Sequence, residues 1–372
     1  MSDARDINRS RLECLDGFRG LAAVWVMLSH CGIWGGANVL HLPSPKLAVD
    51  LFMVLSGFLM MHNYGTLLER GDGNWRKAVL QFYGRRFFRL APLYYVVLAA
   101  LFLWGQPMLD GYSTLRALNP EVWSGNVVYD PARLTLDAPN FLWHVSFLFG
   151  LSPTRSFSTM LPDWSLSLEM QFYAFFPLLL VLARRFTLVG VAGGALVVAI
   201  LSTRLLGKFY EPSLLAFSLH TFIAGMLLSV ASRAGGRTED KVAAAALVML
   251  LAGWNSRLML PLIALLLLCV MGDGQWGGGG IKAVRALFSC RPARFVGDVS
   301  YAIYLFHGAV IAVAGSRLLQ WSALSAWSKP EQVGLMTLVV VVITLPLAWL
   351  LHVLIEKPGI SLGKHVLSKA RA

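Results

Sequence analysis

The feature that most constrains this chain is a series of apolar stretches of membrane-spanning length that recurs from one end to the other. Of its 372 residues, 56% are hydrophobic and 14% are charged, whereas a water-soluble domain carries about 25% charged residues. Backbone groups inside a bilayer must be satisfied within a helix or a closed barrel, and these runs lack the two-residue alternation of barrel strands. The sequence therefore predicts an all-α, polytopic transmembrane helical bundle.

The apolar runs between charges and turn residues predict about ten spans, each of roughly the 20 residues that a bilayer requires or somewhat fewer. They are Phe18–Trp34, Leu47–Tyr64, Leu90–Trp104, Trp164–Ala183, Thr187–Leu205, Ser213–Ala231, Val242–Trp254, Leu258–Met271, Phe295–Ser316 and Val333–Ile355. Phe141–Leu151 is too short to cross, so we expect it to be interfacial or re-entrant. We expect residues 1–372 to form one membrane-embedded domain, with no cleavable signal and no appended soluble domain.

The net charge of +12 is explained by where the basic residues fall. With both termini in the cytoplasm, most of the 32 Lys and Arg residues lie in the expected inner segments, in agreement with the positive-inside rule. The charge therefore indicates one face of a plasma (inner) membrane and argues against a nucleic-acid partner. The four cysteines form no close pair in the sequence and indicate neither a disulfide framework nor a zinc site, so we predict no metal.

Ionisable residues within the expected spans are candidates for function, because charge inside a membrane is costly. His30 follows Arg19 by eleven residues, which is about 16 Å along a helix and nearly three whole turns, so both residues lie on one helix face. Counting inward from the outer helix ends places His30, Asp50 and Glu169 at comparable heights, about 6–8 Å below the outer surface. We expect these three groups, from three different helices, to form an outer layer.

A second layer is basic and is expected at the inner face. Arg86 and Arg89 are spaced i, i+3 and so share one side of a helix. Between the two layers, Tyr301, Tyr304 and His307 recur at intervals of three and form a polar edge about midway through the membrane. Carboxylates stand at the inner ends of other expected spans, at Asp16, Asp298 and Glu356.

Each of these residues also has a purely structural interpretation. Arg86 and Arg89 are explained equally by anchoring at the inner face, and His30 or Glu169 by hydrogen bonding between packed helices. The tyrosines are explained by packing. The inner carboxylates are explained as helix caps or as salt-bridge partners of the arginines.

Taken together, six segments resemble the acyltransferase 3 family of integral membrane O-acyltransferases. Any one segment would be weak, but they follow the family's order across nearly the whole chain. They begin with Leu15-Asp16-Gly17-Phe18-Arg19-Gly20 leading to His30, and continue with residues 49–58, residues 82–94, Trp164-Ser165-Leu166-Ser167-Leu168-Glu169, residues 297–307 and Glu356-Lys357-Pro358.

The resemblance implies ten core helices, an acyl-CoA donor on the cytoplasmic side and transfer to a sugar hydroxyl of an envelope or secreted glycan. The family's Arg-ten residues-His pattern falls on Arg19 and His30, its Arg-X-X-Arg pattern on Arg86 and Arg89, and its Trp-Ser-Leu stretch leads to Glu169. The acyl group is expected to be acetyl, carried by acetyl-CoA. Membrane lipid is a further expected partner.

These residue types suit that chemistry. Acyl transfer to a hydroxyl needs a base for the hydroxyl proton, and we expect His30 to serve, with Glu169 or Asp50 orienting it. One guanidinium group can donate two parallel hydrogen bonds to the oxygens of a phosphate. Arg19, Arg86 and Arg89 are therefore expected to hold the phosphates of coenzyme A. We assign Tyr301 and Tyr304 to donor binding as well. Direct transfer is favoured over an acylated His30, although both remain open.

Two functions of other classes remain as alternatives. A transporter of a glycan or lipid-linked intermediate would use the same buried polar residues as a proton relay or substrate path. A membrane sensor or assembly partner would need no donor site. Within the enzyme class, a lipid acceptor is also open. Aromatic residues of the long connection between residues 105 and 163 fit either sugar binding or anchoring at the interface: Tyr112, Trp123, Tyr129, Trp143 and His144.

Overall fold

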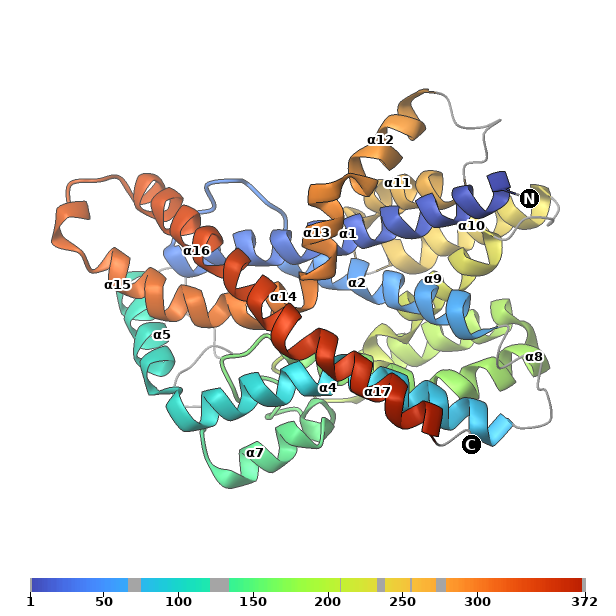
Figure 1. Cartoon of the computed structure of the whole chain (residues 1–372), viewed down its shortest axis with the longest axis horizontal. Coiled ribbons are helices and arrows are strands. Elements are labelled where there is room, and N and C mark those ends of the chain that lie inside the picture. The colour runs from blue at the N-terminus through green and yellow to red at the C-terminus, as the bar shows by residue number, and fades with distance from the viewer. Residues whose placement is uncertain are drawn as a thin grey trace.

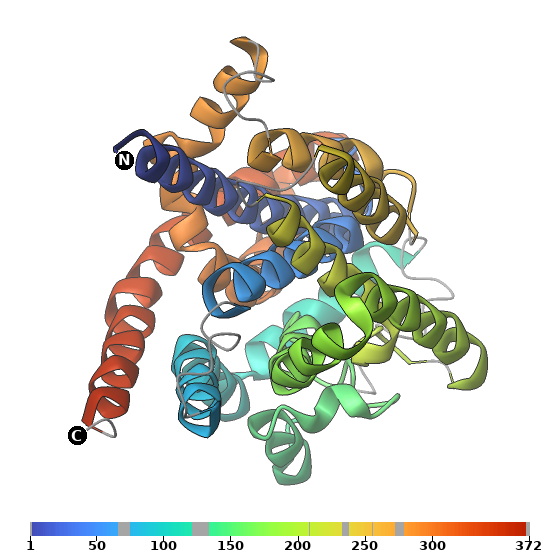
Figure 2. The ribbon, with the colours of Figure 1, turned by 90° about the vertical axis from the view of Figure 1, so that its right-hand side faces the viewer.

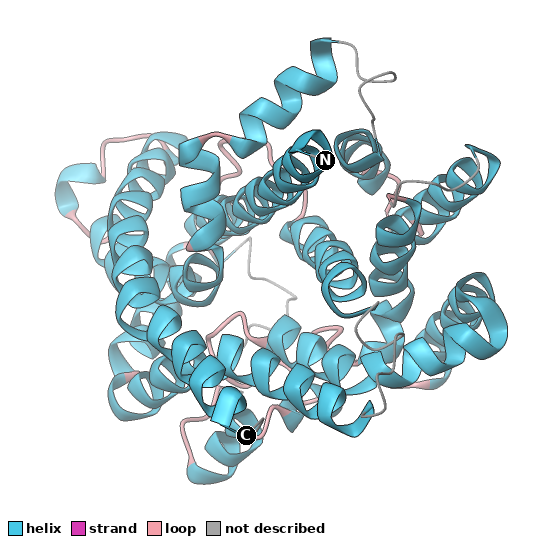
Figure 3. Cartoon of the chain, turned by 45° about the vertical axis from the view of Figure 1, so that its right-hand side comes forward, coloured by secondary structure: helices cyan, strands magenta, loops and turns pink. Residues whose placement is uncertain are grey.

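The structure, a computed structural model, describes residues 2–65, 75–120, 134–207, 209–232, 238–254, 256–271 and 279–369. Every regular element in these ranges is helical, and no strand occurs among them (Figure 3). The all-α prediction is therefore confirmed. Trp123 and Tyr129 of the long connection lie outside the described residues.

Within the described ranges, five helical segments are long and apolar enough to cross a membrane. They are Pro45–Gly65, Trp75–Trp104, Trp164–Leu205, Ser300–Leu319 and Lys329–Lys369, and shorter apolar helices cover Leu215–Ala231, Lys241–Gly253 and Met259–Val270. All eight overlap spans predicted from the sequence. The chain is therefore a helical membrane protein, built on segments that the apolar pattern had located.

The elements follow one another along the chain with few long connections. In order they are α1 (Ser2–Gly35), α2 (Pro45–Met60), η1 (Met61–Gly65), α4 (Trp75–Trp104), α5 (Gln106–Leu118), α7 (Ala138–Val145), η3 (Leu148–Leu151), α8 (Trp164–Leu205), α9 (Leu215–Ala231), α10 (Thr238–Gly253), α11 (Met259–Met271), α12 (Gly279–Ser289), α13 (Arg291–Asp298), α14 (Ser300–Val310), η4 (Ile311–Gly315), α15 (Ser316–Leu319), η5 (Ser322–Leu324), α16 (Lys329–Leu351), η6 (His352–Glu356) and α17 (Lys357–Lys369).

Two helix boundaries refine the expected spans. Non-helical backbone at Thr187 (φ 64°, ψ 156°) divides α8 into two segments, at the point where the sequence placed a turn between two spans. The span expected to begin at Phe295 is wrong at its start, because α13 ends at Asp298 and α14 begins at Ser300. Val299 lies between them with ψ near 4°, outside the helical range, so the chain can change direction there.

Helix α1 organises the bundle. It packs against α2, α12, α13, α14 and α16, and it runs lengthwise through the upper half of the molecule in Figure 1. On the opposite side, α17 lies along α4 (Figures 1 and 2). The start of α1 and the end of α17 lie at the same end of the bundle (Figure 1).

The crossing of α2 and α9 depends on two glycines. Gly57 of α2 faces the carbonyl oxygen of Phe222, and Gly225 of α9 faces the carbonyl oxygen of Val54, so a Cβ atom at either position would collide with backbone. Small residues at helix contacts allow such close approach within membranes. The helix that carries Ser56 is thereby held firmly against α9.

We expect Gly225→Val to destabilise the protein by about 3 kcal/mol, because a fixed backbone carbonyl cannot move aside to relieve the overlap. Gly193→Val is the matched control, since nothing lies within 4 Å of a Cβ at that glycine. Thermal unfolding of the detergent-solubilised protein, followed by size-exclusion chromatography, compares the two variants. Equal melting temperatures for both variants would contradict the close crossing.

Candidate functional site

One cavity contains the arginines that the sequence singled out, and we call it the arginine cavity. Helices α1, α2, α4, α8, α9 and α14 form its walls. Six of the residues predicted for the site line it: Arg19, Arg86, Arg89, Glu169, Tyr301 and Tyr304. Its other walls are largely apolar, with Phe52, Met53, Leu90 and Phe222 among them. Three guanidinium groups therefore line one shared space.

A second cavity contains His30 and His307, and we call it the histidine cavity. Trp34, Phe157 and Trp164 contribute aromatic walls, while Lys46 and Glu211 contribute charge. The two cavities share Val49 and Tyr304 as lining residues. They therefore meet at these side chains.

Helix α1 links the two cavities. Arg19 lines one and His30 lines the other, as expected for two residues on one helix face at a separation of about 16 Å. The spacing of the two residues in the sequence thus sets the distance from the arginine cavity to the histidine cavity. Arg19 is also within 3.6 Å of Asp16, one helical turn earlier.

The imidazoles of His30 and His307 are hydrogen-bonded to each other. His30 Nδ1 lies 2.8 Å from His307 Nε2, and the two rings meet edge to edge, with centroids 5.1 Å apart and planes inclined by 19°. His307 Nδ1 lies 3.0 Å from the carbonyl oxygen of Ile303. Because a carbonyl oxygen only accepts, His307 Nδ1 must carry hydrogen, and in the neutral ring Nε2 is then an acceptor. His30 Nδ1 therefore donates, which leaves the His30 Nε2 lone pair unprotonated.

The ring of His30 is held on one face and at one edge. Trp34, one turn later in α1, stacks on it at 5.8 Å between centroids, and Trp34 in turn packs edge-on against Tyr112 at 5.2 Å. His307 is fully buried and holds the ring at its Nδ1 edge. The imidazole of His30 is thus fixed in orientation as well as in tautomer. The sequence placed His307 on a polar edge but did not pair it with His30.

Glu169 lines the arginine cavity, and the structure does not bring it together with His30. Ser56 Oγ donates to its carboxylate at 2.6 Å, and the Tyr173 hydroxyl donates a short hydrogen bond to the same oxygen. The carboxylate thereby connects α8 to α2. This places Glu169 on the side of the arginines.

Asp50 also lies apart from His30. Its side chain is buried and lines neither cavity, and Lys46 Nζ is 3.9 Å from its carboxylate. Lys46 lines the histidine cavity. Lys46, one turn earlier, therefore connects Asp50 to that cavity.

Arg86 and Arg89 have different surroundings, although they are three residues apart on α4. Arg86 donates to the Tyr64 hydroxyl at 2.8 Å and lies over the rings of Tyr64 and Tyr173, at 4.9 and 5.8 Å from their centroids. Cation–π contacts of this kind hold a guanidinium without neutralising it. Arg86 keeps its full positive charge toward the cavity.

Arg89 forms an ion pair with the buried carboxylate of Glu356. The other oxygen of Glu356 lies 2.8 Å from His352 Nδ1, and both residues belong to the π-helical segment η6. The sequence had left Glu356 as a cap or as a salt-bridge partner of the inner arginines, and it is the partner of one. The charge of Arg89, one of the two arginines of the Arg-X-X-Arg pattern, is therefore compensated by a carboxylate within the protein.

Tyr301 and Tyr304 also differ. The Tyr301 hydroxyl donates to the carbonyl oxygen of Leu90 at 2.9 Å and ties α14 to α4. The Tyr304 hydroxyl lies 2.7 Å from Ser165 Oγ on α8. Of the two, only Tyr304 lines both cavities.

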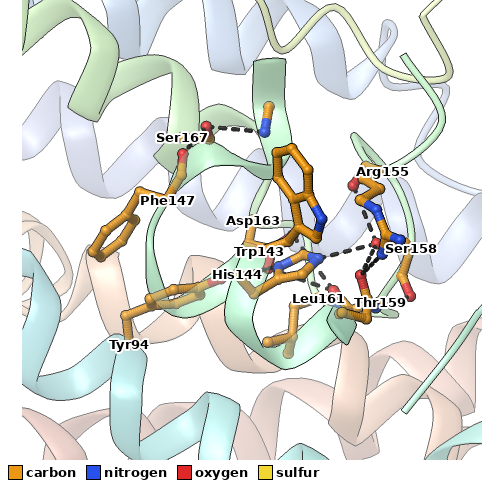
Figure 4. A network of polar contacts seen from close by, with 12 residues as sticks. Tyr94, Trp143, His144, Phe147, Arg155, Ser158, Thr159, Leu161, Asp163 and Ser167 are labelled. Carbon is orange, nitrogen blue, oxygen red and sulfur yellow. Dashed lines mark hydrogen bonds and ion pairs between the residues drawn. The ribbon is translucent and has the colours of Figure 1, made fainter. Parts of the chain in front are cut away.

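A buried network beside the histidine cavity has the appearance of a Ser–His–Asp triad (Figure 4). His144 lies 3.0 Å from Ser158 Oγ through Nε2 and 2.9 Å from Asp163 through Nδ1, and the Tyr94 hydroxyl donates to Asp163 at 2.9 Å. Ser158 donates to Asn140 at 2.8 Å. Ser158, His144 and Asp163 are buried and line neither cavity, so no substrate in either space reaches this serine.

The network instead supports a wall. Phe157, Met160, Pro162 and Trp164 alternate with its members along the chain and do line the histidine cavity. Tyr94 connects this segment to α4. Because the contacts join residues far apart in the chain, no spacing in the sequence indicated them.

Among the residues that the structure describes, no group of three or more His, Cys, Asp or Glu side chains is arranged to hold a metal ion. The polar groups that line the two cavities include guanidinium, ammonium, imidazole, carboxylate and hydroxyl groups. Guanidinium groups around a shared space fit a phosphorylated molecule, and an unprotonated, oriented imidazole fits proton abstraction.

Comparison with known proteins places this geometry in a family context. A family model described as an acyltransferase domain, of the acyltransferase 3 type, matches residues 12–353. The chain is 24% identical to acyltransferase MdmB of Streptomyces mycarofaciens, over 94% of this chain and 91% of that protein. It is 26% identical to peptidoglycan O-acetyltransferase OatA of Listeria monocytogenes serovar 1/2a, over 88% of this chain but only 53% of that protein. No solved structure matches the chain.

We expect Asp163→Ala to destabilise the protein by about 3–5 kcal/mol, because it removes the acceptor of three buried groups, on His144, Tyr94 and Thr159. Asp110→Ala is the matched control, since Asp110 is exposed and bonds only to Gln106 among the hydrogen bonds described, and such surface changes stay within about 0.5 kcal/mol. Chemical unfolding in detergent measures both. A loss no larger than that of the control would show that the network is not what holds the wall.

Proposed function

Because this chain belongs to the acyltransferase 3 family and is an O-acyltransferase, we propose that it transfers an acetyl group from cytoplasmic acetyl-CoA to a hydroxyl of an envelope or exported polysaccharide. One observation carries the proposal most directly. A cavity with three guanidinium groups and a cavity with an unprotonated imidazole meet at Val49 and Tyr304. A donor bound in one can thus present its acyl end to an acceptor bound in the other.

The names of related proteins support an acetyl group as the acyl group and a glycan as the acceptor. OatA is named for O-acetylation of peptidoglycan. The chain spans about half of the length of OatA, and we propose that it shares the O-acetyl transfer for which OatA is named. The aromatic walls of the histidine cavity, at Trp34, Phe157 and Trp164, suit the apolar faces of sugar rings.

The donor side is the arginine cavity. Arg86, which is not neutralised by an acid, is placed to bind phosphate oxygens of coenzyme A, with Arg19 and Arg89 beside it. Tyr301 lines the path of the donor. We assign Glu169 to the same side, where it holds Ser56 and Tyr173 and so keeps Tyr173 under Arg86.

The acceptor side is the histidine cavity. His30 Nε2 takes the proton of the attacking hydroxyl, while His307 holds the ring in the required tautomer. The alcohol oxygen forms a bond to the thioester carbon, the carbon–sulfur bond breaks, and the imidazolium returns its proton to the departing thiolate. We assign transfer to this single displacement, with no acyl group resting on His30. Asp50 acts through Lys46 at the edge of the cavity.

The orientation in the membrane follows from the same assignments. Arg19 precedes His30 on α1, and α1 begins at the end of the bundle where α17 finishes (Figure 1). The arginine cavity therefore lies toward both termini, which the distribution of Lys and Arg assigns to the cytoplasm. We accordingly propose about ten spans, a single domain over residues 1–372, and a place in the cell's inner membrane.

Incubation of membranes with labelled acetyl-CoA and polysaccharide tests the function as a whole. Label in the polysaccharide, dependent on the protein, is the expected result. Entry of substrate into vesicles without modification would instead identify a transporter and overturn the proposal. Compositional analysis of surface polysaccharide from a deletion strain identifies the acceptor.

We expect His30→Ala to lower the rate of transfer by about 10²–10⁴-fold, the usual contribution of a general base, with normal protein level and membrane insertion. His307→Leu removes the acceptor of the His30 Nδ1 hydrogen and should cost about 100-fold, whereas His307→Gln, whose amide oxygen still accepts, should retain more activity. Retained activity in His30→Ala would refute the assignment. Equal activity in the two His307 variants would refute the role of the tautomer.

We expect Arg86→Gln to raise the KM for acetyl-CoA by at least about tenfold with a smaller change in kcat, since the lost contact is to a phosphate in the ground state as well as in the transition state. The substrates to compare are acetyl-CoA and S-acetylpantetheine, which lacks the nucleotide and its phosphates. The wild-type protein should strongly prefer acetyl-CoA, and Arg86→Gln should lose most of that preference.

Arg76→Gln is the control for this experiment, because Arg76 belongs to the same helix α4 but lines neither cavity. Its preference for acetyl-CoA should match that of the wild type. An undiminished preference in Arg86→Gln would place the phosphates elsewhere.

A further inference from the structure

Tyr304 occupies the one position at which a side chain with a hydroxyl group borders both cavities in the described part of the chain. Its ring packs edge-on against Phe52 at 5.9 Å and lies 6.2 Å from the ring of His307. Its hydroxyl reaches Ser165 of the arginine cavity. Val49, the other shared residue, carries no polar side-chain group. The tyrosine thus extends from His307, the partner of the base, to the donor side.

The hydroxyls of Tyr304 and Ser165 together have a hydrogen to spare. They lie 2.7 Å apart and share one hydrogen bond, in which either oxygen can be the donor. Two hydroxyl hydrogens serve this single bond, and the structure gives neither group another partner among the described residues. When Ser165 donates, the Tyr304 hydrogen is free to point at a bound molecule. The ring contacts with Phe52 and His307 keep the phenol in place for that bond.

The neighbouring groups are already committed. The Tyr301 hydroxyl donates to the carbonyl oxygen of Leu90. His307 Nε2 accepts from His30 and has no hydrogen to offer. In the proposed function Arg86 and Arg89 face the donor phosphates, and Tyr64, Tyr173 and Glu356 hold them there. Of the two residues that line both cavities, Val49 and Tyr304, only Tyr304 carries a hydrogen-bond donor on its side chain, and Ser165 supports it.

We propose that the Tyr304 hydroxyl, held in place by Ser165, donates a hydrogen bond to the carbonyl oxygen of the acyl thioester and stabilises the oxyanion that forms there. The inference rests on the proposed function. A thioester whose nucleotide lies among the arginines, and whose carbonyl carbon is attacked from the side of His30, has its carbonyl oxygen at this junction. Donors placed where negative charge develops stabilise the transition state more than the bound substrate.

The chemistry balances without a further reactant. As the alcohol oxygen bonds to the carbonyl carbon, the carbonyl π electrons move to oxygen, which accepts from Tyr304, and His30 takes the hydroxyl proton. When the oxyanion collapses, the carbon–sulfur bond breaks and the thiolate leaves with the proton that His30 returns. Tyr304 keeps its own proton throughout, so phenylalanine removes only the hydrogen bond.

The test is Tyr304→Phe in the full-length protein in membranes. Loss of one oxyanion donor lowers kcat by about 10²–10³-fold in enzymes, and we expect a fall of at least about 100-fold. Binding of a non-reactive thioether analogue of acetyl-CoA should stay within about twofold of the wild type, because the hydrogen bond strengthens only as charge develops. Tyr83→Phe is the matched control. It removes a hydroxyl bonded to the carbonyl of Ala174 at another helix contact, outside both cavities, and should keep the wild-type kcat.

Ser165→Ala provides a second, independent variant. It leaves the Tyr304 hydroxyl present but unsupported, so kcat should fall by about five- to tenfold. In the double variant the loss should equal that of Tyr304→Phe alone, since both residues act through one hydrogen bond. Multiplying losses would mean that the two residues act separately and would overturn the proposal.

The outcomes separate this inference from the proposed function. If the wild-type protein transfers no label, the function itself is wrong. If the wild type transfers label and Tyr304→Phe keeps its kcat, only the oxyanion role is wrong. A variant that loses affinity for the thioether in proportion to kcat would make Tyr304 a binding residue, which also overturns the proposal. If Tyr304→Phe fails to fold, the test passes to Ser165→Ala, and an unchanged kcat in that variant overturns the proposal.

Discussion

A hydrogen bond between two imidazoles decides where a proton can be accepted in this protein. His30 and His307 come from α1 and α14, 2.8 Å apart, and the carbonyl oxygen of Ile303 fixes the tautomer of the pair. Many catalytic histidines are oriented by a carboxylate, which also stabilises the protonated ring. A neutral imidazole orients without contributing that charge. In the proposed reaction this favours a base that returns its proton to the leaving thiolate within the same displacement.

The bilayer imposes the second constraint, because charges within it must be compensated by the protein. Glu356 compensates Arg89, whereas the aromatic rings of Tyr64 and Tyr173 hold Arg86 without cancelling its charge. Two arginines of one motif thus have separate uses, one in joining α4 to the C-terminal helix and one in facing the cavity. Beside the histidine cavity, the hydrogen bonds of His144 hold together the segment from Phe157 to Trp164, which forms a wall of that cavity.

Much of the fold and of the candidate site was predictable from the sequence, because these features depend on periodicity within a single helix. The apolar runs located the membrane helices, the spacing from Arg19 to His30 placed one residue in each cavity, and the resemblance to the acyltransferase 3 family is confirmed. Counting depth along separate helices was less informative. It put Glu169 level with His30, but height says nothing about the direction in which a side chain points, and Glu169 faces Ser56 and Tyr173.

The sequence by itself determined that the chain is a helical membrane protein, which residues carry charge within it, and which of them share a helix face. Those properties follow from hydrophobicity and from a repeat of 3.6 residues per turn. Only the tertiary structure decided the partners. His307 lies against His30, Glu356 against Arg89 and Tyr304 against Ser165 because helices distant in the chain pack together. Such contacts depend on how each helix is rotated and crossed against its neighbours, which side-chain packing across the whole bundle sets.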